Sequence, residues 1–176
     1  MHFLAISGSA RLASTNTALL RALRTAAGSA HVVTVHGRIG DLPVFSPDLE
    51  HPRLPEPVAG FVRAIEAADG LIVASPEYVR SIPGGLKNAI DWLVSRDTLI
   101  GKPVALVHAS RRGDDMLQQL RLVLGTVSDR FNEDLFLRFD LMKLSPDDIG
   151  RHLSQDRHRT AIRDFLDAFA ARCAPA

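Results

Sequence analysis

Short apolar runs alternate with helical patterns along the whole chain, and this alternation limits the possible folds more than any other feature. Five runs have the length of strands, at residues 3–6, 32–35, 71–74, 104–107 and 135–139. The middle runs are continuously apolar, which is typical of parallel strands covered on both faces. The pattern predicts an α/β fold, a doubly wound five-stranded parallel sheet with helices on both faces.

The segments between these runs carry apolar residues at helical spacing. Four apolar side chains follow the i, i+3, i+4, i+7 rule in each of the segments 58–65, 86–93 and 162–169. Further helices are expected over residues 16–27 and 115–126, and Ser145 marks the start of a short one. With 176 residues, the chain is expected to form a single domain over residues 1–176.

The charges of the chain exclude several kinds of partner. Lys and Arg number 21 and Asp and Glu 20, so the net charge is +1, and the signs are interspersed rather than gathered into the basic stripe of a nucleic-acid binder. No apolar run approaches the roughly 20 residues that cross a bilayer, and the N-terminus lacks the features of a signal peptide. We therefore expect a cytoplasmic protein without nucleic-acid or membrane partners.

Two features stand apart from the alternating pattern. The single cysteine, Cys173, lies four residues after Phe169 on the apolar side of a helical pattern, which favours a buried small hydrophobe without chemistry. Residues 36–57 hold five of the ten prolines and are expected to form a long ordered loop. Such a loop is either functional or a cover for the sheet edge that packs on a neighbouring subunit.

The segment after the first predicted strand gathers polar groups at the start of a helix. Its side chains include four donors and one guanidinium: Ser9, Ser14, Thr15, Asn16 and Arg11. The free N–H groups and partial positive charge of a helix N-terminus favour an anion at the same place. Ser14 or Asn16 could instead serve only as a helix cap, but a cap needs one such residue. The segment therefore predicts a phosphate site.

The missing motifs narrow the choice of phosphate ligand. Neither GxGxxG nor GxxxxGK followed by Ser or Thr occurs, so a Rossmann dinucleotide site and an ATPase are not indicated. A single phosphate held by hydroxyls suits a mononucleotide such as FMN. The loop at residues 75–85 follows the third predicted strand, and its Tyr78 offers an aromatic face to a planar ring. By composition alone, that loop could also be only a rigid connection.

Two segments resemble a known family, the NAD(P)H-dependent FMN reductases of the flavodoxin-like superfamily, which include quinone and chromate reductases. GSARLASTN at residues 8–16 is similar to the family's GSxRxxSxN phosphate loop. SPEYVRSIPGGLKNAIDWLVSR at residues 75–96 is similar to its flavin loop and following helix. The resemblance covers nearly the whole chain in the order of its elements. It implies a flavodoxin-like fold, FMN as cofactor and NADPH or NADH as co-substrate.

The resemblance also implies roles for individual residues. The FMN phosphate is expected to contact Ser9, Arg11, Ser14, Thr15 and Asn16. Pro76, Glu77 and Tyr78 are expected to border the isoalloxazine ring. Val79 would meet the ring only through its backbone, since many members have Asn at this position.

The loop after the fourth strand departs from the family pattern. The glycine-rich sequence that the family has near the flavin edge is replaced by HASRRGDD at residues 108–115, in which only Ser110 and Gly113 match. The resemblance implies that Ser110 contacts the cofactor. Arg111 and Arg112 either bind the extra phosphate of NADPH or, as we expect, pair with Asp114 and Asp115 in a solvated turn. His108 is expected to be structural rather than a proton-transfer group.

The resemblance implies an FMN-dependent NAD(P)H oxidoreductase that reduces quinones, free flavin or similar small-molecule acceptors by a ping-pong cycle. The chemistry would take place on the flavin, without a catalytic side chain or a metal. The family assembles through the region of the helix that we expect over residues 86–94, so a homodimer or homotetramer is expected. Trp92 is there either the interface anchor or a cover for its own sheet.

Two other functions remain open at this point. A flavodoxin-like electron carrier would bind FMN and a protein partner, although the near-neutral charge argues against the strongly acidic surface that docks to basic partners. A flavin-free binding module is suggested by Val79 and by the missing glycines around Ser110.

Overall fold

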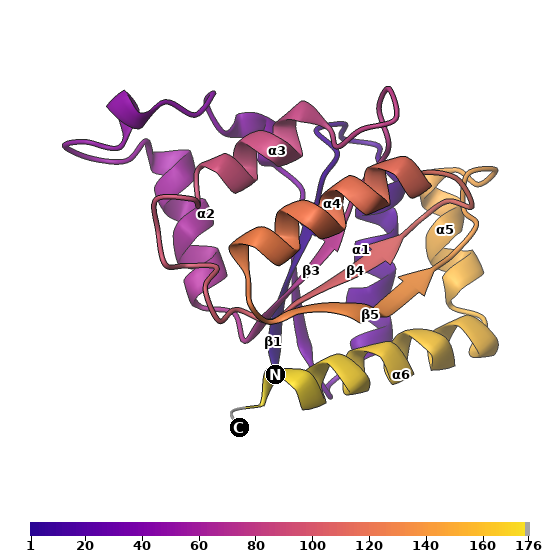
Figure 1. Cartoon of the computed structure of the whole chain (residues 1–176). Helices are drawn as coiled ribbons and strands as arrows, with labels where there is room; N and C mark the ends of the chain where they lie inside the picture. Colours follow the sequence, from indigo (N-terminus) through magenta and orange to yellow (C-terminus); the bar gives the residue numbers. More distant parts are fainter. Residues whose placement is uncertain (175–176) are drawn as a thin grey trace.

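Five parallel strands form the centre of the computed structural model, which describes residues 1–174 (Figure 1). The strands are β1 (His2–Ser7), β2 (Val32–His36), β3 (Gly70–Ala74), β4 (Val104–His108) and β5 (Phe131–Arg138). Their spatial order is β2-β1-β3-β4-β5, and every neighbouring pair is parallel. This is the flavodoxin-like order, in which ligands bind outside the carboxyl ends of β1 and β3.

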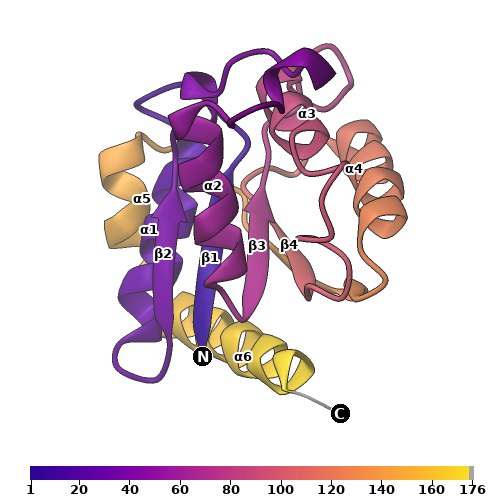
Figure 2. The same ribbon diagram turned by 90° about the vertical axis from the view of Figure 1, so that its left-hand side faces the viewer.

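Helices cover both faces of the sheet, as the sequence predicts. The helices are α1 (Thr15–Ala27), α2 (Glu56–Glu66), α3 (Gly84–Asp91), α4 (Asp114–Val127), α5 (Pro146–Leu153) and α6 (Asp156–Cys173). One core cluster joins the sheet to α1, α5 and α6, and a second joins it to α2, α3 and α4. In Figure 2, α1 and α5 lie on one side of the sheet and α3 and α4 on the other. The predicted fold class is thereby confirmed.

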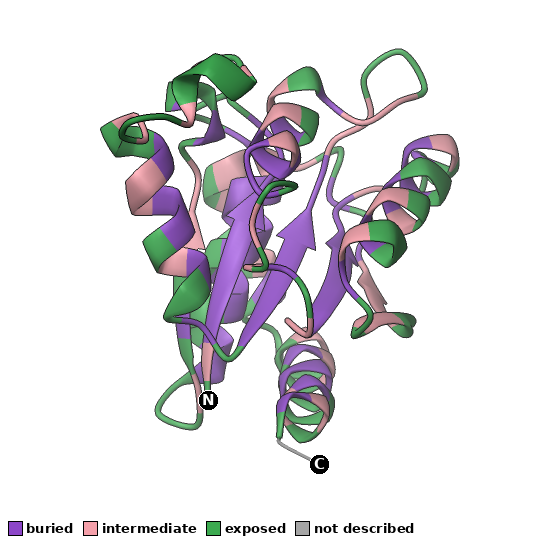
Figure 3. Cartoon of the chain, turned by 60° about the vertical axis from the view of Figure 1, so that its left-hand side comes forward, coloured by how far each residue is buried: buried purple, intermediate pink, exposed green. Residues whose placement is uncertain are grey.

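The burial of the central strands explains their continuous apolar runs. All five residues of β3 and of β4 are buried, and Figure 3 shows the sheet as a buried layer between partly exposed helices. At the start of β3, a Cβ on Gly70 would lie 2.6 Å from Cys173 Sγ and 2.8 Å from Phe169 Cζ. Cys173 is buried, and this burial raises its thiol pKa to about 11. Its predicted role as a small hydrophobe is confirmed.

The fifth strand and the third helix differ from their predicted bounds. β5 begins at Phe131 rather than at residue 135, because an edge strand with one solvated side includes exposed residues such as Glu133 and Asp134 that an apolar-run criterion rejects. α3 ends at Asp91 rather than at residue 94. Its last turn tightens to i→i−3 bonds, with the Leu93 N–H donating to Ile90 O at 2.9 Å.

The proline-rich loop is fastened to α3 of the same chain. It contains the short 3-10 helices η1 (Ile39–Asp41) and η2 (Pro47–Leu49). Trp92 is fully buried, and its Nε1–H donates to Pro43 O at 2.8 Å. Phe45 meets the indole edge to face with ring centroids 5.1 Å apart, and its N–H donates to Asn88 Oδ1 at 2.7 Å. Of the two interpretations of Trp92, the interface anchor is therefore wrong, because the ring lies inside its own subunit.

Within residues 1–174, none of the helices combines the length and the apolar character that crossing a membrane requires.

Candidate functional site

A cavity of about 640 Å³ opens at the carboxyl ends of the strands. Its wall is formed by the loops that follow β1, β3, β4 and β5, and the volume is within the range of small-molecule sites. Nine of the ten predicted site residues line it: Ser9, Arg11, Ser14, Thr15, Asn16, Pro76, Glu77, Tyr78 and Ser110. The tenth, Val79, lies outside the cavity wall. The structure thus brings two segments 60 residues apart in the sequence into one site.

A close backbone approach joins the loops after β1 and β3. The Gly8 N–H donates to Ala74 O at 2.7 Å. A Cβ on Gly8 would lie 2.9 Å from Leu86 Cδ2, 3.0 Å from Ser75 Oγ and 3.2 Å from the backbone Ala74 O, so these neighbours would have to shift. Glycine at position 8 therefore allows the first loop to meet the third strand, and this contact positions both loops at the cavity.

The first loop is organised by its own hydroxyl groups. Ser14 is the N-cap of α1 and accepts the Thr17 N–H at 3.4 Å, so its capping role is real. Ser9 Oγ accepts the Arg11 N–H at 3.2 Å. These bonds leave the α1 N-terminus facing the cavity, with Thr15 as its first residue. Among residues 1–174, no carboxylate pairs with the Arg11 guanidinium.

Asn16 supplies a direct indication that the first loop is built for a ligand. Its side chain is 6% exposed, yet Oδ1 has no hydrogen-bond partner among the described residues. A buried amide oxygen without a partner is costly and uncommon in native proteins. A hydroxyl or N–H donor of a bound molecule would satisfy it. With the helix N-terminus and Arg11, this donor and acceptor set fits the phosphate and hydroxyl groups of FMN.

The loop after β3 is a tight hairpin rather than a simple connection. The Tyr78 N–H donates to Ser81 O at 3.1 Å, and the Ser81 N–H donates to Tyr78 O at 3.0 Å. Val79 and Arg80 both adopt positive φ values, 50° and 58°, as a two-residue type I′ turn requires. The hairpin is fastened to α4 because Arg80 pairs with Asp115 at 2.6 Å. This turn carries the Val79 side chain away from the cavity, where it is 97% exposed.

We predict that Val79→Asn stabilises the protein by about 1 kcal/mol, because a β-branched side chain is strained at positive φ and Asn tolerates that region. Urea denaturation monitored by circular dichroism measures the change. Val44→Asn is the matched control, since Val44 is also exposed but does not have a positive φ. Equal shifts for the two variants would show that lost surface hydrophobicity, not backbone strain, explains the effect.

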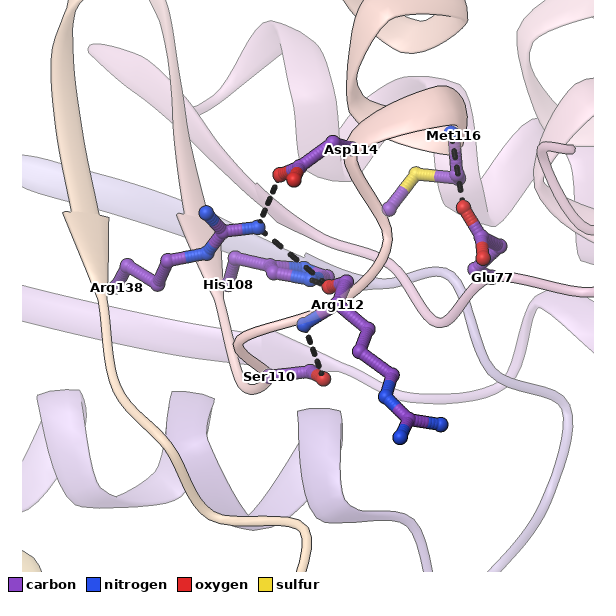
Figure 4. A network of polar contacts seen from close by, with 7 residues as sticks. All are labelled: Glu77, His108, Ser110, Arg112, Asp114, Met116 and Arg138. Carbon is purple, nitrogen blue, oxygen red and sulfur yellow. Dashed lines mark hydrogen bonds and ion pairs between the residues drawn. The ribbon is translucent and has the colours of Figure 1, made fainter. Parts of the chain in front are cut away.

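Glu77 connects the loop after β3 to α4, the helix that follows β4. Its Oε2 accepts the Met116 N–H at 3.1 Å (Figure 4). The N-cap of α4, Gly113, offers no side chain, so Glu77 satisfies one of the free N–H groups of that helix. A negative charge at this end also interacts favourably with the helix dipole. Glu77 therefore helps to position α4 against the cavity.

His108 organises the loop after β4. It is 2% exposed, and its Nε2 lies 2.6 Å from Arg112 O. A carbonyl can only accept, so we assign the ring proton to Nε2. Burial lowers the pKa of His108, which favours the neutral ring. Gly113 packs against this imidazole at φ 101°, where a Cβ would lie 2.8 Å from Nε2. The geometry agrees with the structural role expected for His108.

The predicted pairing inside the RRGDD turn is wrong. Asp114 instead pairs with Arg138 of β5 at 2.5 Å (Figure 4), and Asp115 pairs with Arg80. Arg111 pairs with Asp140 at 2.8 Å. The reason is that the two acids begin α4 and face neighbouring segments, while the arginines precede Gly113 and line the cavity.

Three residues that follow β5 belong to the site without having been predicted from the sequence. Asp140, Met142 and Lys143 line the cavity, although no role was predicted for them. Only the position of these residues could have indicated their place in the site, because every loop at the carboxyl end of a parallel strand is a candidate for binding a ligand. Among residues 1–174, no group of three or more His, Cys, Asp or Glu side chains is arranged to bind a metal ion.

Comparison with known proteins decides the family. The sequence model of the family described as NADPH-dependent FMN reductase matches residues 1–131, which include β1 to β4 and their loops. The chain belongs to this family. The resemblance seen in the two loop motifs is thereby confirmed.

The chain is also similar to individual curated proteins. A quinone reductase of Escherichia coli (strain K12) is 38% identical over 109 residues, covering 60% of this chain and 57% of the relative. The match thus spans little more than half of that protein. A 2-hydroxy-1,4-benzoquinone reductase of Burkholderia sp. is 33% identical over 141 residues, covering 76% of this chain and 75% of the relative.

A solved structure supports the family fold. The flavoenzyme FerB from Paracoccus denitrificans, an NAD(P)H:(acceptor) oxidoreductase, superposes with a TM-score of 0.76 at 26% identity. The alignment covers 98% of this chain and 96% of FerB. The fold therefore continues beyond residue 131, through β5 and the C-terminal helices.

Proposed function

We propose that this chain is an FMN-dependent NAD(P)H oxidoreductase that reduces quinones, free flavin or related small-molecule acceptors. The observation that carries the proposal is the convergence of the phosphate-loop and flavin-loop segments on one cavity of about 640 Å³. Family membership supports it, as do relatives whose names include quinone reductase and 2-hydroxy-1,4-benzoquinone reductase.

The residues of the cavity divide into two groups in this proposal. The FMN phosphate lies at the N-terminus of α1, where N–H groups and the Arg11 guanidinium donate to it. The residues that hold it are Ser9, Arg11, Ser14, Thr15 and Asn16. The ring lies beside the loops after β3 and β4, bordered by Pro76, Glu77, Tyr78 and Ser110. When bound, FMN supplies the hydride and electron transfer, while the protein binds and orients the reactants.

The loops after β3 and β4 contribute rigidity to the site more than reactive groups. Tyr78 is held by both hydrogen bonds of its hairpin, and Glu77 is held by the Met116 N–H. Ser110 Oγ accepts the Arg112 N–H at 3.0 Å. Loops whose polar groups are already paired lose little freedom when a ring enters. The site therefore acts by orienting two reactants against each other.

The deciding experiment is an anaerobic absorbance measurement. We expect purified protein, loaded with FMN and freed of excess, to keep a flavin band that bleaches when NADPH or NADH is added and returns when a quinone is added. A bound flavin that neither nicotinamide bleaches would contradict the oxidoreductase and favour an electron carrier. A protein that retains no FMN would favour a binding module for another anion.

We further propose that the protein acts in the cytoplasm as a homodimer or homotetramer. Large apolar side chains are exposed on the loops around the cavity: Leu12, Tyr78, Val79 and Met142. Exposed apolar groups gathered near a site often mark a protein interface. Light scattering coupled to size-exclusion chromatography tests the assembly, and a monomer at micromolar concentration would contradict it.

A further inference from the structure

The charges that line the cavity do not balance. Four cationic and two anionic side chains contribute to its wall: Arg11, Arg111, Arg112, Lys143, Glu77 and Asp140. Asp140 pairs with Arg111 at 2.8 Å, and Glu77 accepts the Met116 N–H. Within residues 1–174, the other three cations have no carboxylate at ion-pair distance. The proposed FMN phosphate takes the one on the loop after β1, Arg11.

The acids nearest to Arg112 in the sequence are also engaged elsewhere. Asp114 pairs with Arg138 and Asp115 pairs with Arg80. Within residues 1–174, neither Arg112 nor Lys143 has a carboxylate at ion-pair distance. Figure 4 shows the Arg112 side chain extending away from Asp114 and from the network around His108.

Hydrogen bonds hold the backbone of Arg112, whereas its guanidinium has no hydrogen-bond or ion-pair partner within residues 1–174. The Arg112 N–H donates to Ser110 Oγ at 3.0 Å, and its carbonyl accepts from His108 Nε2 at 2.6 Å. Arg138 Nη2 lies 3.5 Å from the same carbonyl. Both polar groups of this peptide segment are thus satisfied inside the protein. Because the backbone of Arg112 is already ordered, binding a ligand through its guanidinium costs less conformational entropy.

Sheet geometry separates these cations from the proposed FMN phosphate. Arg112 follows β4 and Lys143 follows β5, whereas the phosphate loop follows β1. In the order β2-β1-β3-β4-β5, two strand spacings separate β1 from β4, roughly 10 Å, and three separate it from β5, roughly 14 Å. The strands that carry Arg112 and Lys143 thus end further from the phosphate loop than β3 does.

We propose that Arg112, assisted by Lys143, binds an anionic group carried by one of the two substrates that enter beside the flavin. This inference rests on the proposed function and names a specificity determinant for it. A guanidinium matches the oxygen geometry of a phosphate, sulfonate or carboxylate with paired hydrogen bonds. The anionic group is either the extra phosphate that distinguishes NADPH from NADH or an acidic substituent on the acceptor.

Direct binding to the FMN-loaded protein tests this proposal in two arms. Calorimetry compares NADP⁺ with NAD⁺ in one arm, and 1,4-naphthoquinone-2-sulfonate with 1,4-naphthoquinone in the other. We expect Arg112→Gln to weaken binding of the member that carries the additional anionic group, in one pair, by about tenfold, as loss of a charge-assisted hydrogen bond implies. The member without that group should bind as before. Lys143→Gln should act in the same direction with a smaller factor.

The controls separate this proposal from the function on which it rests. Arg24→Gln removes an equally exposed charge from the last turn of α1, outside the cavity lining, and should change neither pair. An unchanged preference in Arg112→Gln would overturn the proposal, and so would a loss of FMN affinity, which would place Arg112 in the cofactor site. Wild-type flavin that neither nicotinamide bleaches would instead overturn the oxidoreductase, while the binding comparison would still decide the role of Arg112.

Discussion

Replacing Thr15 by glutamate should weaken FMN binding about a hundredfold, because like charges brought together at a binding site cost several kcal/mol and each 1.4 kcal/mol is about tenfold in affinity. Thr15 is the first residue of α1 and lines the cavity where the phosphate is proposed to lie. A carboxylate there would repel a phosphate dianion and would compete for the free N–H groups of the helix.

The same substitution should not destabilise the protein. A negative charge in the first turn of a helix is favourable by about 0.3–1 kcal/mol, and the first turn of α1 carries no acidic residue. Fluorescence titration should therefore show a loss of FMN affinity. Thermal unfolding of the ligand-free protein should show unchanged or slightly higher stability. A parallel loss of affinity and stability would point to a folding defect instead of charge repulsion.

Two controls isolate the phosphate. Riboflavin, which has the same ring without the phosphate, should bind Thr15→Glu and wild-type protein alike. Thr25→Glu adds the same charge ten residues further along α1, about 15 Å away at 1.5 Å per residue, and should leave FMN affinity within about twofold. If riboflavin binding falls as much as FMN binding, the phosphate does not lie at the α1 N-terminus.

Replacing Trp92 by alanine should lower the free energy of unfolding by about 3–5 kcal/mol, the usual cost of removing a large buried aromatic side chain. Trp92 has no exposed surface, packs edge to face against Phe45 and donates to Pro43 O. Its loss would open a cavity between α3 and the proline-rich loop. Chemical denaturation measures the change, and hydrogen exchange locates it at residues 43–45.

Trp92→Phe divides this effect into its parts. It retains most of the packing but removes the indole N–H, so we expect a loss of about 1 kcal/mol for the hydrogen bond together with a smaller packing loss. Pro43 O would still accept from Asn88 Nδ2 at 2.9 Å. A Trp92→Ala variant as stable as wild type would contradict the inward role of this residue and restore the interface interpretation.

The central strands could be predicted because their environment is uniform. β1, β3 and β4 are buried by helices on both faces, so nearly every residue must be apolar whichever neighbours it meets. β5 lies at the sheet edge and mixes exposed and half-buried positions. Its first four residues therefore carry no continuous apolar signal, and its start was predicted too late.

The two main loops of the site could also be predicted, because local motifs and strand order determine their positions. Ser9 and Tyr78 line one cavity since β1 and β3 are neighbours in the sheet and both strands end at the same edge. The loop after β5 was overlooked because no local motif marks Asp140 or Lys143. Their place in the cavity depends on the position of β5 beside β4.

By itself, the sequence determined the alternation of elements, the doubly wound class and the two loops, after β1 and β3, that line the cavity, since these depend on periodicity and short motifs. Only the tertiary structure decided that Trp92 faces inward and that Asp114 and Asp115 pair with Arg138 and Arg80. Ion pairs and burial depend on segments far apart in the chain. A neighbouring opposite charge in the sequence is therefore a weak guide to the partner that folding brings closest.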